Sequence, residues 1–220
     1  MSKQLKAVLF DLDGVIVDTA RYHYLAWKRI AEEEGIAFDE KANEGLKGVS
    51  RMASLDLILA RGKKTYSIEQ KIALADKKNA IYVDMIAGLR PDEILPGVKD
   101  FLASLAAAGV KRAICSASKN APMILDRLGV TKDFDTVVSG NDTSRSKPDP
   151  EVFEMAAGRL GVPPAECLVV EDAYAGIQAA KAAGMKAVGI GEAHVLDIAD
   201  LVYSGTAQLS LPAIKKSLFS

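Results

Sequence analysis

The stretch KAVLFDLDG, residues 6–14, decides the fold. Its first six residues form a short apolar run without polar alternation, which is typical of a strand buried on both faces of a parallel sheet. The run ends at Asp11, and the following turn carries a second carboxylate, Asp13. The sequence therefore predicts a buried parallel strand with acidic side chains at its carboxyl end.

Similar apolar runs recur along the second half of the chain, with helix-like segments between them. The runs lie at 111–116, 135–138, 167–172, 186–190 and 200–203. The helix-like segments lie at 97–108, 120–128, 149–160 and 173–183. This alternation predicts an α/β fold, a doubly wound parallel core domain formed by residues 1–15 and 95–220. Its ligand crevice would lie beyond the carboxyl ends of the strands.

Residues 16–94 interrupt this alternation, because they contain about four helical segments and no convincing strand. They are expected to form an inserted all-helical cap domain. The chain returns to the core through LRPDEILPG, residues 89–97, whose prolines and glycine provide turn chemistry and a hinge.

The composition points to a small-molecule partner. The 28 basic residues nearly balance the 29 acidic ones, so nothing indicates binding to nucleic acid or to an anionic membrane. No apolar segment reaches the roughly 18 residues of a membrane span. Cys115 and Cys167 lie in apolar runs without metal-binding spacing, which fits free thiols in a reducing cytoplasm. We therefore expect a cytoplasmic protein, with a monomer as the default.

Six chemically active side chains follow strand ends or lie in neighbouring loops, so the fold would gather them into one crevice. They are Asp11, Asp13, Ser116, Lys147, Glu171 and Asp172. A carboxylate that attacks a phosphate dianion meets charge repulsion, so such a site must supply a divalent cation and a fixed positive charge. Lys147 and Ser116 would bind the oxygens of the transferring phosphoryl group.

The acidic residues divide into three roles. Asp11 would be the nucleophile that forms an aspartyl phosphate. Asp13 would carry a proton between its carboxyl group and the substrate oxygen. Glu171 and Asp172 form an acidic pair suited to Mg²⁺, a hard ion that takes few carboxylates together with waters and phosphate oxygens. The candidate metal-site residues are Asp11, Asp13, Glu171 and Asp172.

Four motifs resemble those of the haloacid dehalogenase superfamily, in the same order. They are DLDGV at 11–15, CSAS at 115–118, SKPDP at 146–150 and VVEDA at 169–173. Together they are specific and span the chain, although each alone would be weak.

Further motifs look like those of the β-phosphoglucomutase subgroup. They are HYLAWK at 23–28, LKGVSR at 46–51, KKN at 77–79 and SASKN at 116–120. The resemblance implies Mg²⁺-dependent interconversion of β-D-glucose 1-phosphate and glucose 6-phosphate through bound β-glucose 1,6-bisphosphate.

A mutase needs a closing cap and a second phosphate site far from Asp11, because the bisphosphate must turn round while water is excluded. Arg51 could hold the distal phosphate bidentately, helped by Ser118 and Asn120. The resemblance also implies that His23 and Lys78 couple cap closure to Asp13. The substrate-binding candidates are Thr19, His23, Trp27, Lys47, Gly48, Val49, Arg51, Ser54, Lys78, Ser116, Ala117, Ser118, Asn120 and Lys147.

Plainer roles stay open for several of these residues. Glu171 and Asp172 could cap the helix that begins near Ala173, and His23 and Trp27 have the spacing of a packed pair on one helix face. The stretch SGNDTSRSKPDP, residues 139–150, reads more like the phosphatases of the superfamily. A sugar-phosphate phosphatase is therefore the alternative, and a catalytically silent sugar-phosphate binding module is a third reading.

Overall fold

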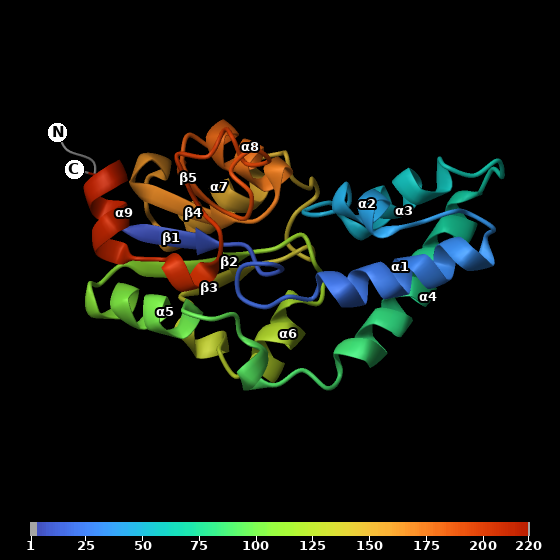
Figure 1. Ribbon diagram of the computed structural model, residues 1–220, viewed down its shortest axis with the longest axis horizontal. Coiled ribbons are helices and arrows are strands. Elements are labelled where there is room, and N and C mark those ends of the chain that lie inside the picture. Colours follow the sequence, from blue (N-terminus) through green and yellow to red (C-terminus); the bar gives the residue numbers. More distant parts are fainter. Residues whose placement is uncertain (1–3, 220) are drawn as a thin grey trace.

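The computed structural model of the protein describes residues 4–219 and contains one six-stranded sheet (Figure 1). The strands are β1 (Ala7–Phe10), β2 (Lys111–Cys115), β3 (Thr136–Val138), β4 (Cys167–Glu171), β5 (Lys186–Ile190) and β6 (Leu201–Tyr203). Every neighbouring pair is parallel, in the order β3-β2-β1-β4-β5-β6. The predicted strands are thus confirmed to within one residue at each end. The order reverses beside β1, so a crevice opens beyond the ends of β1 and β4.

The central strand β1 is buried on both faces, as its unbroken apolar sequence predicts. Side chains alternate between the faces of a strand. Val8 and Phe10 join the core that packs under three helices, α5 (Val98–Ala107), α6 (Ala121–Leu128) and α9 (Leu211–Leu218). Ala7 and Leu9 join the core on the opposite face, under α7 (Glu151–Leu160) and α8 (Tyr174–Ala182). The two helix layers show on either side of the sheet in Figure 1.

Four helices form a separate unit beyond the carboxyl ends of the strands (Figure 1). They are α1 (Ala20–Glu33), α2 (Glu40–Glu44), α3 (Arg51–Leu59) and α4 (Ile68–Ile86). Their shared core includes Trp27, Ile30, Leu55 and Ile58. Residues 16–94 thus contain four α-helices and no named strand, as expected, and the domain boundaries at residues 15 and 95 remain a prediction.

The cap joins the core through two adjacent segments of chain. The turn after β1 forms a bridge between Asp13 and Val17, and Val17 forms an antiparallel bridge to Ile94 on the returning segment. The backbone amide of Leu95 donates to the carbonyl of Ile16 at 2.9 Å. The outgoing and returning segments are therefore fixed to each other directly beside Asp13.

The helices of the core begin and end within two residues of the predicted bounds. Helix α9 was not predicted. Four short 3₁₀ helices were also not predicted, namely η1 (Pro91–Glu93), η2 (Thr131–Asp133), η3 (Pro164–Glu166) and η4 (Thr206–Gln208). A proline lies in the first turn of α9, where its missing N–H costs nothing. None of the helices within residues 4–219 combines the length and apolar character that a membrane crossing needs.

Candidate active site

The site is built around a buried ion pair at the end of β1. Asp11 follows the last residue of β1 and is only 6% exposed. The Lys147 ammonium donates to Asp11 Oδ1 at 2.5 Å, to Glu171 Oε2 at 2.7 Å and to the Cys115 carbonyl at 3.1 Å. Three strand ends therefore supply the three oxygens that satisfy one buried ammonium group, so Lys147 is not a surface lysine.

Burial and charge set the ionisation of this group. Burial alone would lower the pKa of Lys147, but the charges of Asp11 and Glu171 outweigh it and raise the pKa, so the ammonium stays charged. Burial, followed by the charge of Asp11, raises the pKa of Glu171 to about 8 and that of Asp172 to about 7. The site therefore holds more carboxylate than one lysine can neutralise, and it is suited to a further cation.

A divalent cation fits the oxygens that the structure brings together. One carboxylate oxygen each from Asp11, Glu171 and Asp172 lies within 4.8 Å of the others. Hard oxygen donors with excess negative charge are what Mg²⁺ prefers. The carboxylate of Asp13, included among the metal-site candidates, lies outside this group of three.

Asp13 is held on the other side of the turn by a hydrogen bond from the Thr19 hydroxyl. Its carboxyl group opens onto the cavity but is otherwise surrounded by protein. Burial, then the charges of Asp11 and Asp172, raise its pKa well above the ordinary value. A carboxyl group with a raised pKa can hold a proton near neutral pH and give it to a departing oxygen.

A cavity of about 520 Å³ lies between the cap and the core. From the core it is lined by Asp11, Asp13, Ser116, Ala117, Ser118, Asn120 and Asp172. From the cap it is lined by His23, Trp27, Lys47, Gly48, Val49, Arg51, Ser54 and Lys78. Most of the predicted site residues thus meet in one space, whereas Thr19, Lys147 and Glu171 lie behind its wall.

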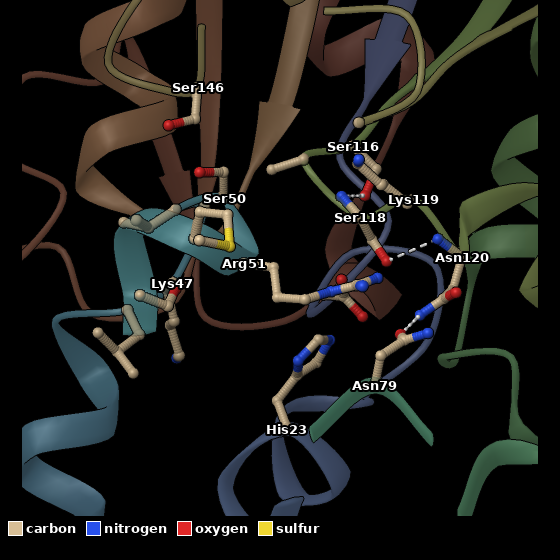
Figure 2. Close-up of a pocket in the computed structure, with 18 of the residues that line it drawn as sticks. His23, Lys47, Ser50, Arg51, Asn79, Ser116, Ser118, Lys119, Asn120 and Ser146 are labelled. Carbon is tan, nitrogen blue, oxygen red and sulfur yellow. Dashed lines mark hydrogen bonds between the residues drawn. The ribbon is translucent and has the colours of Figure 1, made fainter. Parts of the chain in front are cut away.

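One end of the cavity collects donors that point at the same region (Figure 2). Arg51, the first residue of α3, extends from the cap toward Ser118 and Asn120. The Asn120 side-chain amide donates to Asn79 Oδ1 at 2.8 Å, which links core to cap. Among residues 4–219, the one ion-pair partner of Arg51 is Asp76, at 4.0 Å, so within that range most of the five guanidinium donors have no partner and could bind a ligand.

Asn79 lines the cavity but is absent from the predicted site residues, although it ends the motif KKN at 77–79. Within α4, Ala75, Lys78, Asn79 and Tyr82 have the spacing i, i+3, i+4, i+7 of a single helix face. That spacing could have found Asn79, and also Tyr82, which was not selected.

Lys78, which is buried, and His23, which is half-buried, form a pair on the cap wall of the cavity. Lys78 Nζ lies 2.8 Å from His23 Nδ1 and sits over the rings of Trp27, at 4.8 Å, and Tyr82, at 4.5 Å. Burial, followed by the charge of Arg51, lowers the pKa of Lys78 to about 7. Burial and the charge of Lys78 lower the pKa of His23 well below its usual range. The predicted neighbours therefore do meet, and Trp27 both packs in the cap core and lines the cavity.

A model of the haloacid dehalogenase-like hydrolases matches residues 5–184 of the chain. The chain belongs to the haloacid dehalogenase-like hydrolase family. The resemblance of its four motifs to that superfamily is thereby confirmed.

Among curated relatives, the β-phosphoglucomutase of Bacillus subtilis (strain 168) is 47% identical over 209 residues, covering 94% of this chain and 92% of the relative. A phosphorylated carbohydrates phosphatase of Thermotoga maritima is 29% identical, covering 94% and 95%. The crystal structure of a β-phosphoglucomutase from Clostridium difficile superposes with a TM-score of 0.95 at 43% identity, covering 98% of this chain and 97% of that one.

In this member of the family, the cap touches the core at the metal side of the cavity. Lys47 Nζ lies 3.6 Å from Asp172 Oδ2 and 3.0 Å from Glu44 Oε2. Gly48 has a φ of +72°, and a Cβ there would meet the Lys147 side chain at 3.5 Å. A glycine is favoured because only it takes this backbone conformation without strain. The cap loop therefore lies directly over the buried ion pair.

The loop before Lys147 forms part of the rim of the cavity. Gly140 and residues 143–146 line the cavity. The Glu151 carboxylate accepts from the backbone amides of Ser144, at 3.2 Å, and Arg145, at 2.6 Å, and this fixes the loop. Lys119 is exposed and also lines the cavity.

Proposed function

We propose that the protein is a β-phosphoglucomutase, which interconverts β-D-glucose 1-phosphate and glucose 6-phosphate. The observation that carries this proposal is the 47% identity to the β-phosphoglucomutase of Bacillus subtilis, because it extends over 94% of the chain and thus includes the cap. A cytoplasmic location and a monomeric state remain predictions.

Asp11 and Asp13 would act together in two half-reactions, and each of them would end the cycle in its starting state. In the first, an Asp11 oxygen attacks a phosphoryl group of β-glucose 1,6-bisphosphate, the phosphorus–oxygen bond to the sugar breaks, and Asp13 gives its proton to the departing sugar oxygen. In the second, the free hydroxyl of a glucose monophosphate attacks the phosphorus of the aspartyl phosphate, the bond between phosphorus and the Asp11 oxygen breaks, and Asp13 takes the proton of that hydroxyl. The raised pKa of Asp13 supports this assignment.

Positively charged and hydrogen-bonding groups would stabilise the negative charge on the phosphoryl group during its transfer. Lys147 and Ser116 would hold the phosphoryl oxygens against Asp11. Mg²⁺, held by Asp11, Glu171 and Asp172, would offset negative charge on the phosphoryl oxygens when it is bound. Both groups reduce the repulsion between a carboxylate and a phosphate dianion.

Arg51, Ser118 and Asn120 would bind the phosphate that is not being transferred. They lie at one end of a cavity of about 520 Å³, within the size range of pockets for small ligands. Arginine suits this role because its planar fork pairs with two phosphate oxygens. A sugar with two phosphates could thus bind in either orientation, which interconversion requires.

Arg51→Lys tests this distal site. The change keeps the charge and removes the bidentate geometry, so we expect KM for β-D-glucose 1-phosphate to rise about tenfold, with a larger rise for Arg51→Ala. The melting temperature should stay the same because the only ion-pair partner of Arg51 among the described residues is 4.0 Å away. The matched control is Arg29→Lys, on the exposed side of α1. An unchanged KM for Arg51→Lys would remove the residue from the site.

The Mg²⁺ requirement should depend on pH. Glu171 and Asp172 have raised pKa values, so both carboxyl groups are increasingly protonated as the pH falls, and protons then compete with the cation. Each competing proton raises the half-saturating Mg²⁺ concentration by up to about tenfold per pH unit below the pKa. Activity titrations with Mg²⁺ between about pH 8 and about pH 6 measure this. A half-saturating concentration that does not change with pH would contradict the assignment of these ligands.

A sugar-phosphate phosphatase is the second candidate. It is favoured by the 29% identity to the phosphorylated carbohydrates phosphatase of Thermotoga maritima and by the position of residues 143–146 on the rim of the cavity. A changed loop there would alter the access of water to the aspartyl phosphate.

Phosphorus NMR separates the two candidates. The protein is given Mg²⁺, β-D-glucose 1-phosphate and a trace of β-glucose 1,6-bisphosphate, and the signals of glucose 6-phosphate and free phosphate are followed together. The mutase predicts glucose 6-phosphate with little free phosphate. Free phosphate as the main product would favour the phosphatase, and no turnover would point to another sugar or to a silent binding module.

A further inference from the structure

Gly176 is a buried glycine in a helix where alanine would be the better residue. It is the third residue of α8, whose nine residues include four alanines. A glycine inside a helix costs stability relative to alanine. Gly176 is also not among the glycines that have a positive φ. The backbone of α8 therefore gives no reason for a glycine at this position.

The space beside Gly176 does give a reason. A Cβ on this residue would lie 2.1 Å from Glu171 Cδ, 2.2 Å from Glu171 Oε2 and 2.4 Å from Glu171 Cγ. Non-bonded carbon atoms pack at about 3.5–4.0 Å. The Glu171 carboxylate therefore lies directly against the bare Cα of Gly176, in space that any other side chain would fill.

The Glu171 side chain is not free to swing aside. It has 0% exposure, and both of its carboxylate oxygens are hydrogen-bonded. Oε1 accepts from the backbone amide of Ala173 at 3.1 Å, and Oε2 accepts from the Lys147 ammonium at 2.7 Å. A movement away from a new Cβ would break at least one of these bonds and leave a buried group without its partner.

The position of this carboxylate matters to two cations. Oε2, the oxygen that a Cβ on Gly176 would meet, is the one that pairs with Lys147. One oxygen of Glu171 also belongs to the group of three carboxylates within 4.8 Å of one another that is suited to Mg²⁺. A shift of this side chain would therefore disturb the buried ammonium group and the metal site together.

Asp172, the other acidic residue of the pair, also lies against a glycine. A Cβ on Gly14 would lie 2.3 Å from Asp172 Oδ2. Gly14 has a φ of +79°, so any substitution there would add backbone strain as well. Gly176 is therefore the position at which the contact can be tested alone.

We propose that Gly176 is a positioning residue, which sets the Glu171 carboxylate toward Lys147 and Mg²⁺ by leaving empty the space that this carboxylate occupies. The inference rests on the proposed Mg²⁺ site. It concerns how the chain holds that site, and it applies to a mutase and to a phosphatase alike.

Gly176→Ala adds one methyl group at this contact. We expect the Kd for Mg²⁺ to rise about tenfold or more, the usual effect of disturbing a group that orients a metal ligand. Isothermal titration calorimetry without any sugar phosphate measures this Kd. The matched control is Gly158→Ala in α7, because a Cβ there would meet no other part of the described chain within 4 Å. The control should leave the Kd unchanged and raise the melting temperature slightly.

The melting temperature of the metal-free protein shows whether the effect passes through Glu171. Gly176→Ala should lower it in the wild-type background and also in Glu171→Gln, whose side chain fills the same space. In Glu171→Ala the overlapping atoms are gone, so adding Gly176→Ala should lower it no further. A role in helix packing alone would give the same drop in all three backgrounds.

Two results would overturn the inference. One is an unchanged Kd for Mg²⁺ in Gly176→Ala, and the other is an equal drop in melting temperature in the Glu171→Ala background. If Gly176→Ala alone does not fold, the second result still decides, because the double variant must then fold as well as Glu171→Ala does.

The inference and the proposed function can fail separately. Wild-type protein that binds Mg²⁺ but forms mainly free phosphate would contradict the mutase alone, because the comparison of Kd values uses no sugar. Wild-type protein that does not bind Mg²⁺ would overturn the proposed metal site and this inference together.

Discussion

Asp11→Asn should lower kcat for phosphoryl transfer by about four orders of magnitude or more, because an amide cannot replace the carboxylate that forms the aspartyl phosphate. Asp11 is well placed for this role, since it lies at the end of β1 beside a charged Lys147 and on the wall of the cavity. Asparagine has the same shape, so packing is kept. Glucose 6-phosphate formation measures the loss.

The same variant should remain folded. Asp11 is one of three crowded carboxylates, and its charge contributes to the raised pKa values of Glu171 and Asp172. Removing that charge relieves repulsion when no cation is present, so the metal-free variant should melt no lower than the wild type. The control is Asp126→Asn on the exposed face of α6. Turnover close to wild type in Asp11→Asn would exclude Asp11 as the nucleophile.

Lys147→Met should destabilise the metal-free protein by about 3–5 kcal/mol, the cost of leaving buried charges without their partner. The Lys147 side chain has 0% exposure and pairs with both Asp11 and Glu171. Methionine keeps an unbranched apolar chain of similar length, so the loss reports on charge and hydrogen bonding more than on packing. Urea unfolding with and without Mg²⁺ measures it, and Mg²⁺ should recover part of the loss because it offsets the same carboxylates.

Lys132→Met, in the exposed helix η2, is the control for Lys147→Met and should change stability little. If Lys147→Met lowers the free energy of unfolding by less than about 1 kcal/mol, the ion pairs of Lys147 contribute no more than ordinary surface ion pairs do. That result would contradict the description of Lys147 as the buried neutralising group of the site.

The core and its chemistry could be predicted because two local signals coincide in the sequence. Each apolar run is short and bounded, which fixes the strands, and the reactive residues follow the runs directly, as Asp11 follows 7–10 and Asp172 follows 167–171. Parallel strands end at one edge of a sheet, so side chains far apart in sequence meet there. The contact between Lys147 and Asp11, 136 residues apart, follows from that rule.

The contacts between cap and core could not be predicted in the same way, because they depend on how two units pack. The local spacing places Asn79 on the same face of α4 as Lys78, but its partner Asn120 is 41 residues away, so their contact depends on how the cap packs on the core. Gly176 is similar, since a Cβ there would lie 2.1 Å from the Glu171 carboxyl carbon. At these positions the residue type depends on tight contacts that exist only in the folded structure.

In the proposed mutase reaction, Asp11 passes its phosphoryl group back to a sugar and not to water. The most direct measurement phosphorylates the protein with ³²P-labelled acetyl phosphate and Mg²⁺, removes the donor, and adds excess β-D-glucose 1-phosphate. We predict that the label is transferred from the protein to β-glucose 1,6-bisphosphate and then appears in glucose 6-phosphate. Label released chiefly as free phosphate at the same rate with and without the sugar would contradict it.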